Sequence, residues 1–419
     1  MTGCGGRSSA KTDSTTGGDK KQAEATSGKE KITLRIGSGH SESNPWITAL
    51  EDYFVKNVSE RVSEETNYEI DWVKSYGGSV ISLGNELQGV QDGLVDIGCT
   101  ILVFEASRLP LQDMVYSMPF SCSAIMLYYN CDMFREVGLD PNTPPTTIAE
   151  MADDISKLMV KDGDTVTRYG LNVAVRRYQL ANWIGGQGDY NFFGDNEGGR
   201  TAPMTKVTFG EDGTLRNFLT EWQKVIATGG YKPYEDDINE EFSLELFGMA
   251  IMSTARIGKI KSLVGDKFEW NVAALPKVNA DDKGGIAVGG SCVVMFDPDN
   301  DPAQVDATWE FVQFMVSAEE QFQFHQATGY IPVNKTVYNL PEADKWFEEN
   351  PMYKVAIDCI HASNPNVQEP FDIINWEIDS VIKTHMLAFA NGEETLDECH
   401  DRIVEECNER LDDYHLAND

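Results

Sequence analysis

The stretch AIMLYYN, residues 124–130, is a strongly apolar run and predicts a buried strand. Turn residues follow it in DPNTPPT (140–146). The pattern then predicts a helix from about Ile148 to Val160 and a further strand in RYGLNVAV (168–175). Strands that alternate with helices in this way indicate an α/β lobe.

A second unit with the same alternation precedes this run. Its predicted strands are ITLRIGSG (32–39), YEIDWV (68–73) and VDIGCTI (95–101), with apolar residues at helical spacing between them. This order implies a parallel sheet with helices on its faces. Beyond residue 175, the chain has predicted helices at 214–230 and through most of 371–416, and predicted strands at 247–255, 268–276 and 284–296. No linker separates two globules, so we expect two α/β lobes between which the chain crosses more than once.

The charge of the chain excludes several classes of partner. It carries 68 acidic and 34 basic residues, a formal charge of -34. Such a surface repels nucleic acid and gains nothing from anionic membranes. No apolar run approaches the roughly 18 residues of a transmembrane helix. The eight cysteines form no CxxC pair and no zinc-like cluster with histidine, so we expect mostly free thiols and no metal site.

The first 31 residues are rich in Gly, Ser, Thr, Lys and Glu without an apolar period. Such a stretch cannot bury enough surface to offset its ordering entropy, so it predicts a disordered tether. Thr2-Gly3-Cys4 resembles the end of a bacterial lipobox, which implies lipidation of Cys4. The alternative is a plain disordered N-terminus with a stray cysteine.

From about Met118 to residue 416, the chain resembles the bacterial extracellular solute-binding proteins of ABC importers, and most closely the sugar and glycerol-3-phosphate binders. The resemblance rests on segments in the family's order. These segments are MPFSCSAIMLYYNCDMFREVGLDPNTPPTTIAEM, FGMAIMSTARIG, WNVAALPKV, GIAVGGSCVVM and AEEQFQFHQATGYIPVNKTVY.

The first lobe resembles a different group of receptors. LRIGSGHSESNPWITALEDYF and GNELQGVQDGLVDIGCT, within residues 32–120, are similar to TRAP-type solute receptors. The arginine with which those receptors clamp a carboxylate has no counterpart here. The chain therefore reads as a mosaic with a seam near residues 118–124.

Both resemblances imply a two-lobed α/β fold of the type II periplasmic-binding-protein class with a ligand cleft between the lobes. The implied division is 32–123 with 255–312 for lobe 1, and 124–254 with 313–416 for lobe 2. The implied function is that of a monomeric, lipid-anchored extracytoplasmic protein that hands a sugar or polyol to the membrane permease of an ABC importer, without a cofactor. The alternatives are a TRAP receptor for a carboxylate and a glycerol-3-phosphate-type binder.

Three candidate ligand contacts come from the ABC-family resemblance. Tyr330, after a helix that ends at Gly329, matches a tyrosine that faces the cleft; a tyrosine can stack on a sugar and hydrogen-bond to it. Gly290 matches a site of close backbone approach to the ligand, and Ser123 matches a ligand-contacting serine. The alternatives are a core tyrosine, a bulge or tight packing at Gly290, and a surface serine.

Two departures from the glycerol-3-phosphate binders bear on the ligand. Arg256 stands where they have a small hydroxyl residue, and Asp379 falls where they have a phosphate-contacting arginine. The loss of that arginine argues against phosphate and favours the hydroxyl donors of a sugar. Alternatively, Arg256 and Asp379 pair with each other across the closed cleft.

Four further candidates come from residue type and position. Trp183 and Trp376 are potential stacking platforms, although such aromatics are more often core residues. His40 and Tyr76 lie on loops after predicted strands, where ligands collect in open α/β lobes. A loop histidine is usually only solvated.

An enzyme is the competing class of function. The sequence contains no GxSxG, HExxH, P-loop or GxGxxG motif, and nothing singles out a carboxylate pair. DPDNDP (297–302) resembles a calcium loop but lacks its glycine and its final glutamate. We therefore expect a binding protein and no catalytic residues.

Overall fold

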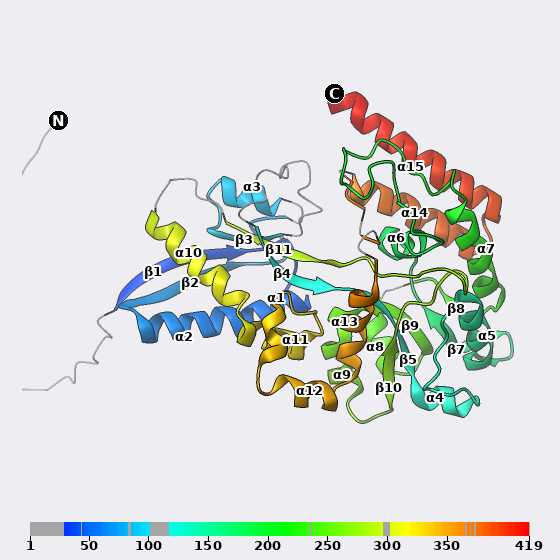
Figure 1. Cartoon of the computed structure of the whole chain (residues 1–419), viewed down its shortest axis with the longest axis horizontal. Coiled ribbons are helices and arrows are strands. Elements are labelled where there is room, and N and C mark those ends of the chain that lie inside the picture. The colour runs from blue at the N-terminus through cyan, green and yellow to red at the C-terminus, as the bar shows by residue number, and fades with distance from the viewer. Residues whose placement is uncertain are drawn as a thin grey trace, which may run out of the picture.

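The structure, a computed structural model, describes residues 29–42, 44–82, 85–100, 117–234, 237–295, 302–364, 367–368, 370–372 and 374–418. Two sheets with their helices lie side by side along the long axis of the molecule (Figure 1). The predicted lipidation site Cys4 and most of the predicted tether lie outside the described residues. Glu30 and Lys31, which the prediction assigned to the tether, pair in the first strand.

The first sheet has the strand order β2-β1-β3-β11-β4. Its strands are β1 (Glu30–Gly37), β2 (Tyr68–Ser75), β3 (Ile97–Thr100), β4 (Ser117–Ser123) and β11 (Gly289–Val294). β1 is parallel to β2 and β3, as the sequence predicts, while β11 runs antiparallel to both β3 and β4. A late strand therefore inserts between β3 and β4, so the chain returns to this sheet after leaving it.

Helices cover both faces of the first sheet. Its flanking elements are α1 (Pro45–Ala49), the π-helical η1 (Leu50–Val55), α2 (Lys56–Glu65), α3 (Glu86–Gln91), α10 (Pro302–Met315) and α11 (Ala318–Thr328). Ile47, Leu50, Phe54 and Val58 recur at helical spacing and are buried in one core cluster with sheet residues. Val90 of α3 packs in a separate small cluster.

The second sheet follows the path β10-β5-β9-β7-β6, with β8 paired to β7. Its strands are β5 (Ile125–Asn130), β6 (Val160–Asp162), β7 (Thr165–Asn172), β8 (Tyr231–Lys232), β9 (Phe247–Ser253) and β10 (Trp270–Ala273). β7 is parallel to β8 and β9, whereas β5 is antiparallel to β9 and β10.

The apolar run that predicts β5 is buried on both sides. Leu127 and Tyr129 point into one core cluster, and Met126 and Tyr128 into the other. A strand between two helical layers needs apolar residues at every position, which explains the lack of alternation in AIMLYYN.

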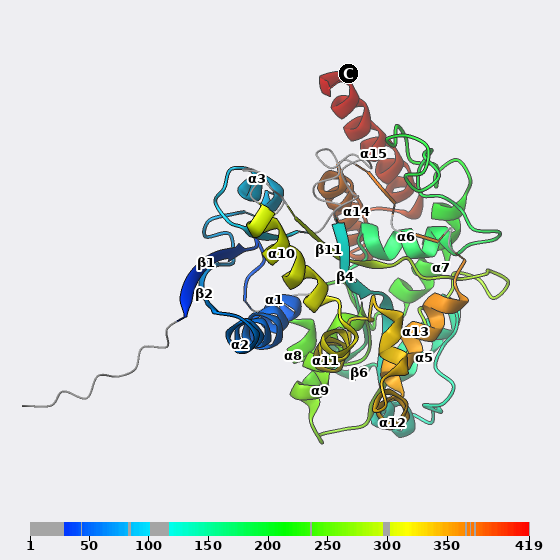
Figure 2. The same cartoon turned by 60° about the vertical axis from the view of Figure 1, so that its left-hand side comes forward.

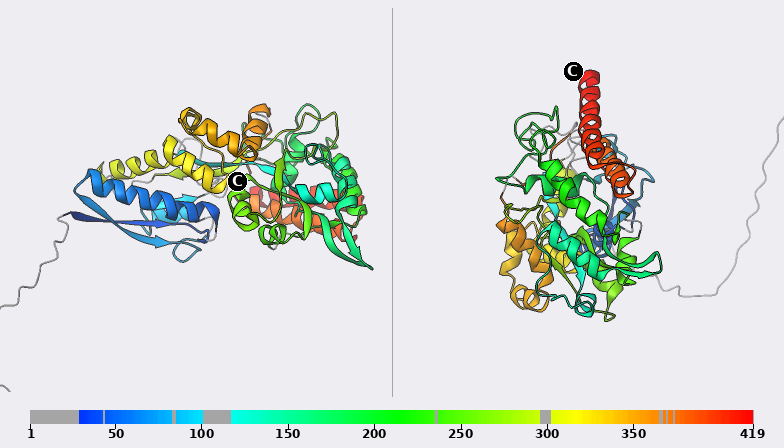
Figure 3. Two further views of the ribbon diagram at one scale, coloured as in Figure 1. Left: turned by 90° about the horizontal axis from the view of Figure 1, so that it is seen from below. Right: turned by 90° about the vertical axis from the view of Figure 1, so that its right-hand side faces the viewer.

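Each face of the second sheet has its own helices. One face carries α4 (Cys131–Glu136), α5 (Ile148–Leu158), α6 (Arg177–Gly185), α7 (Thr214–Ala227), α14 (Asn375–Ala390) and α15 (Leu396–Asn418). The other carries α8 (Ile238–Ser243), the 3-10 turn η4 (Thr254–Arg256), α9 (Ile257–Val264), the 3-10 turn η5 (Lys335–Asn339), α12 (Ala343–Glu349) and α13 (Met352–Ala362). Figures 2 and 3 show the blue strands of the first sheet apart from this larger group of green, orange and red elements.

The lobe boundaries predicted from the sequence differ from the packing in two places. Residues 284–296 contribute β11 to the first sheet, but β10 pairs with β5 in the second, and Trp270 stacks on Tyr128 with ring centroids 5.9 Å apart. Conversely, Met315 and Phe324 pack in the core of the first sheet. We propose a division of 30–123 with 289–330 for the first lobe and 124–288 with 331–418 for the second.

Candidate functional site

The carboxyl ends of the parallel strands in the first sheet lie at one edge. β1 ends at Gly37 and β2 ends opposite it at Ser75. The loops that follow are linked, because the Gly77 amide donates to the His40 carbonyl at 2.8 Å. At the same edge β4 ends at Ser123, opposite Gly289 at the start of β11. Ligands of open α/β sheets bind at such edges.

The second sheet presents the matching edge. β5 begins at Ile125, opposite Ser253 at the end of β9. β7 runs parallel to β9, so the segment after β7 that leads to Arg176 emerges at this edge too. Only Ala124, fully buried, separates β4 of the first sheet from β5 of the second. The carboxyl-terminal edge of the first sheet and the matching edge of the second sheet therefore adjoin.

Three segments meet where the chain passes between the sheets, and we call residues 122–125, 253–256 and 329–331 the crossing junction. The Ile331 amide donates to the Cys122 carbonyl at 2.6 Å, and the Thr254 amide donates to the Ala124 carbonyl at 2.8 Å. Gly329 has φ 94°, and a β-carbon there would lie 2.3 Å from the Thr254 carbonyl oxygen. The predicted left-handed helix end at Gly329 is confirmed, and the close approach of η4 also requires glycine.

The backbone of Tyr330 is fixed by residues of the preceding helix. Nδ1 of buried His325 lies 2.7 Å from the Tyr330 carbonyl oxygen, and the Tyr330 amide donates to the Thr328 hydroxyl at 3.0 Å. The Tyr330 ring is half-buried and stacks on Phe324, with centroids 5.2 Å apart and planes inclined by 9°. Burial raises the pKa of the Tyr330 phenol. Within the described residues its hydroxyl makes no hydrogen bond, so the ring is anchored while its polar end is available.

Arg256 ends η4 at the crossing junction. Its side chain is half-buried, and its charge opposes the rise that burial causes in the pKa values of Tyr128 and Tyr330. In the part of the chain that the structure describes, the guanidinium makes neither a hydrogen bond nor an ion pair.

Asp379 does not pair with Arg256, so that predicted alternative is wrong for this structure. Arg176 holds the carboxylate instead, with Nε 3.0 Å from Oδ2 and Nη2 closer still, and the Arg177 amide donates to Oδ1 at 3.2 Å. The carboxylate thus binds the first amide of α6, where the helix dipole favours negative charge. An arginine of the same lobe compensates the charge of the Asp379 carboxylate. Its oxygens are therefore less available to accept hydrogen bonds from sugar hydroxyls.

Tyr178 is a site residue that the sequence-based reasoning missed. Its hydroxyl donates to the Ala287 carbonyl at 2.9 Å, on the segment that leads into β11. A β-carbon built on Gly289 would lie 3.1 Å from that hydroxyl and 3.5 Å from Oγ of Ser123. Tyr178 of one lobe and Ser123 of the other therefore face the same space. The available signal was the RRY triplet directly after a strand end.

Tight packing explains why residue 290 is a glycine. This is the alternative to a ligand contact that the sequence analysis also considered. The residue has φ 148°, and a β-carbon there would lie 2.0 Å from the Ser121 carbonyl oxygen of β4. The register also shifts between Ser291 and Cys292, which marks a bulge. Glycine is required here by the neighbouring strand, so its presence does not need a ligand to explain it.

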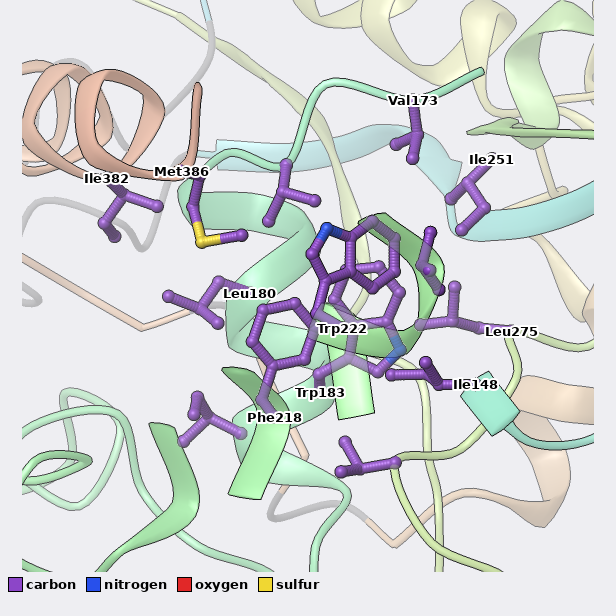
Figure 4. Packing of buried hydrophobic residues seen from close by; sticks show 14 of the residues in the cluster. Ile148, Val173, Leu180, Trp183, Phe218, Trp222, Ile251, Leu275, Ile382 and Met386 are labelled. Carbon is purple, nitrogen blue, oxygen red and sulfur yellow. The ribbon is translucent and has the colours of Figure 1, made fainter. Parts of the chain in front are cut away.

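The two candidate stacking tryptophans have different environments. Trp183 is 2 % exposed, and its indole nitrogen donates to the Pro276 carbonyl at 2.9 Å. Its ring stacks on Phe218 and lies beside Trp222 in the core of the second lobe (Figure 4). The prediction of a ligand platform at Trp183 is wrong, because no face of the ring is open. Trp376, at the start of α14, is 49 % exposed and stays a candidate.

His40 and Tyr76 lie on adjoining loops of the first lobe, as predicted. Burial lowers the pKa of His40, so the ring is neutral at pH 7. The Tyr76 hydroxyl donates to a carboxylate oxygen of Glu51, and burial together with this bond raises the pKa of the phenol. Glu51 also pairs with Lys74, so the polar end of Tyr76 belongs to a local network.

A pocket of about 170 Å³ opens beside the second-lobe edge. It is lined by residues 174–176 after β7, by β8 and the residues that follow it, and by one side of α14, including Arg176, Tyr231, Tyr234 and Lys383. Arg176, which pairs with Asp379, forms part of its wall.

The cysteines take no part in this arrangement as disulfides. All seven cysteines in the described ranges are free thiols, as predicted. Burial raises the pKa of Cys122 and of Cys131 to about 11, so these thiols are protonated at neutral pH and react slowly.

The model of the family described as bacterial extracellular solute-binding protein matches residues 103–355, more than half of the chain. The chain belongs to this family. The predicted ABC-type resemblance of the later residues is confirmed. The family match begins after most of the TRAP-like stretch, whose resemblance stays a prediction.

Curated relatives of the solute-binding protein are glycerol-phosphate binders by name. The sn-glycerol-3-phosphate-binding periplasmic protein UgpB of Pectobacterium atrosepticum is 29% identical over 257 residues, 57% of this chain and 53% of that protein. The protein of that name from Yersinia pestis bv. Antiqua is 27% identical over 256 residues, 57% of this chain and 54% of the relative. The chain thus spans about half the length of the curated relatives it matches.

Solved structures extend the likeness of fold to both lobes. The cyclic α-maltosyl-1,6-maltose binding protein of Arthrobacter globiformis matches with a TM-score of 0.68 at 17% identity, over 92% of this chain and 100% of that chain. UgpB of Mycobacterium tuberculosis, in complex with glycerophosphocholine, matches with a TM-score of 0.69 at 17% identity, over 92% and 99%. The predicted two-lobed type II fold is confirmed.

Proposed function

We propose that this solute-binding protein captures a small sugar or polyol between its two lobes and delivers it to the permease of an ABC importer. The observation that carries the proposal is the crossing junction. There the carboxyl edges of both sheets adjoin, and the hydroxyl of an anchored tyrosine, Tyr330, makes no hydrogen bond to any residue that the structure describes. An aromatic face with a hydroxyl at its edge suits a polyhydroxylated solute.

Two other classes of ligand remain as alternatives to a sugar or polyol. The curated relatives bind sn-glycerol-3-phosphate by name, which keeps a glycerol-phosphate ligand as the second candidate. Arg256, a cation at the junction, favours that candidate in one respect because it attracts anions. A TRAP receptor for a carboxylate is the third, and it rests on the first-lobe resemblance alone.

The remaining parts of the proposal concern the setting. The family is extracellular, and we extend this to an extracytoplasmic monomer without catalytic activity that is held at the membrane by a lipid on Cys4. Among the helices of the described ranges, none has both the length and the apolar composition needed to cross a bilayer.

A thermal-shift screen tests the function directly. Sugars, polyols, glycerol phosphodiesters and carboxylates should be compared side by side on the full chain. A true ligand at 100 times its Kd adds about 2.7 kcal/mol to the free energy of unfolding. Failure of every compound to stabilise the protein would contradict the proposal.

Replacing Tyr330 with phenylalanine should separate binding from stability. Because the hydroxyl makes no hydrogen bond within the described residues, Tyr330→Phe should change the unfolding free energy by less than about 0.5 kcal/mol. Ligand affinity should fall roughly 3- to 10-fold, for one hydrogen bond to the solute. Calorimetric titration of the best ligand from the screen and urea denaturation give the two numbers.

Tyr353→Phe is the matched control. The Tyr353 hydroxyl donates to the Gln326 carbonyl at 3.2 Å in the core, and the residue is 2 % exposed. This variant should lose about 1 kcal/mol of stability and keep its ligand affinity. The same pattern in Tyr330→Phe would remove Tyr330 from the site.

A further inference from the structure

Arg256 differs from most of the arginines in the described ranges. Acidic residues outnumber basic ones, 68 to 34, so an arginine readily finds a carboxylate. Arg176 and Arg177 both do, in the same part of the molecule. Arg256 is half-buried and makes neither a hydrogen bond nor an ion pair within the described residues.

The position of Arg256 is set by the fold. β9 ends at Ser253, and η4 then turns at the crossing junction, where the Ser253 hydroxyl accepts a hydrogen bond from the Ala255 amide. The Thr254 carbonyl lies against Gly329, so the side chains of Arg256 and Tyr330 come from two segments in direct contact. The effect of Arg256 on the pKa of the Tyr330 phenol agrees with this proximity.

The local charge balance leaves Arg256 uncompensated. Asp379, which the sequence alone offers as its partner, is already bound by Arg176 and by the Arg177 amide. Glu51, on the other lobe, is bound by Lys74 and Tyr76. These two carboxylates are therefore already occupied by other partners.

We propose that the captured solute carries one anionic group, a carboxylate or a phosphate, and that Arg256 binds this group with the Tyr330 hydroxyl as a second donor. This inference rests on the proposed solute-binding function and specifies its ligand as a sugar acid or a polyol phosphate. A guanidinium presents a planar fork of donors that matches either oxyanion in two parallel hydrogen bonds. Because Arg256 has no carboxylate partner within the described residues, an oxyanion would supply the counter-charge and the paired acceptors that the guanidinium can take.

The test uses matched pairs of compounds on the full chain. D-galacturonate is compared with D-galactose, and sn-glycerol-3-phosphate with glycerol, by calorimetric titration at low and at high salt. One anionic member should bind, with an affinity at least tenfold above that of its neutral partner. Raising the salt concentration should weaken it. The two pairs distinguish a carboxylate from a phosphate.

Variants locate the contact. Arg256→Gln should lower the affinity for the anionic compound roughly 10- to 100-fold, as for loss of hydrogen bonds to a charged group. Arg256→Lys keeps the positive charge but not the planar pair of donors. Its affinity for the anionic compound should lie between those of the wild type and Arg256→Gln. Arg410→Gln removes the same charge from an exposed position on α15 and should leave the affinity unchanged.

The possible results distinguish a failure of anion binding by Arg256 from a failure of the proposed solute capture. Equal binding of a neutral sugar by the wild type and by Arg256→Gln would overturn the anion proposal and leave solute capture standing. Anion binding that survives Arg256→Gln would also overturn it. If no compound of either pair or of the wider screen binds, solute capture itself fails, and the inference fails with it.

Discussion

Replacing Arg177 with methionine should remove about 3–5 kcal/mol from the free energy of unfolding, measured by urea denaturation. The Arg177 side chain is 2 % exposed, and its partner Asp372 is 0 % exposed. Nε and Nη2 donate to Oδ2 at 2.9 and 2.6 Å, and Nη2 also donates to the Pro370 carbonyl at 2.5 Å. Removing the arginine would leave a carboxylate buried without its counter-charge.

The pKa of Asp372 limits the size of this loss. Burial already raises that pKa, although Arg177 lowers it in part. Without Arg177 the pKa rises further, so the carboxyl group takes up a proton rather than remain charged. The variant should therefore lose less stability at pH 5 than at pH 8.

Two comparisons show whether the buried pair is responsible. Arg216→Met breaks an exposed pair, with side chains 46% and 76% exposed, and should cost less than about 1 kcal/mol. In Arg177→Met/Asp372→Leu no charge is left buried, so much of the stability should return. A loss below 1 kcal/mol in Arg177→Met would show that the pair does not hold the start of α14 to α6.

Local sequence pattern predicts the elements of this fold because burial on helix and strand faces is a local property. The run at 124–130 is buried on both faces, and Ile47, Leu50, Phe54 and Val58 point into one core, as their spacing indicates. The lobe boundaries are less predictable. Strand pairing decides the lobe of β10, and an apolar segment does not specify which sheet it joins.

The candidate site could be predicted only in part from the sequence, because its ion pairs join residues that are far apart along the chain. Arg176 and Asp379 are 203 residues apart, so the ion pair that occupies the Asp379 carboxylate follows from the fold and not from residue type. The burial of Trp183 could have been predicted from the sequence. Leu180, Trp183 and Ile184 have the spacing of one helix face, and all three are buried. The unpaired state of Arg256 has no sequence signal at all.

Acidification should destabilise the protein through His325, the residue that fixes the backbone of Tyr330. Its Nδ1 faces a carbonyl oxygen, which only accepts, so Nδ1 carries the proton and Nε2 is the basic nitrogen. Nε2 is buried without a hydrogen-bond partner in the described residues, and the ring lies against Trp346, Phe347 and Tyr353. Burial lowers the pKa of His325 to about 4.

The direction of the effect follows from that lowered pKa. Above pH 6.5 the imidazole is neutral in both folded and unfolded chains, and its contribution does not depend on pH. As the pH falls from 6.5 towards 4, only the unfolded chain gains the proton, and stability drops by about 1.4 kcal/mol per unit. The loss from this residue should reach about 3 kcal/mol at pH 4.

In His325→Gln, which cannot be protonated, the difference in unfolding free energy between pH 7 and pH 4.5 should shrink by about 2–3 kcal/mol. His361→Gln removes an exposed histidine from α13 and should leave that difference unchanged. An undiminished acid loss in His325→Gln would mean that other groups govern the acid sensitivity.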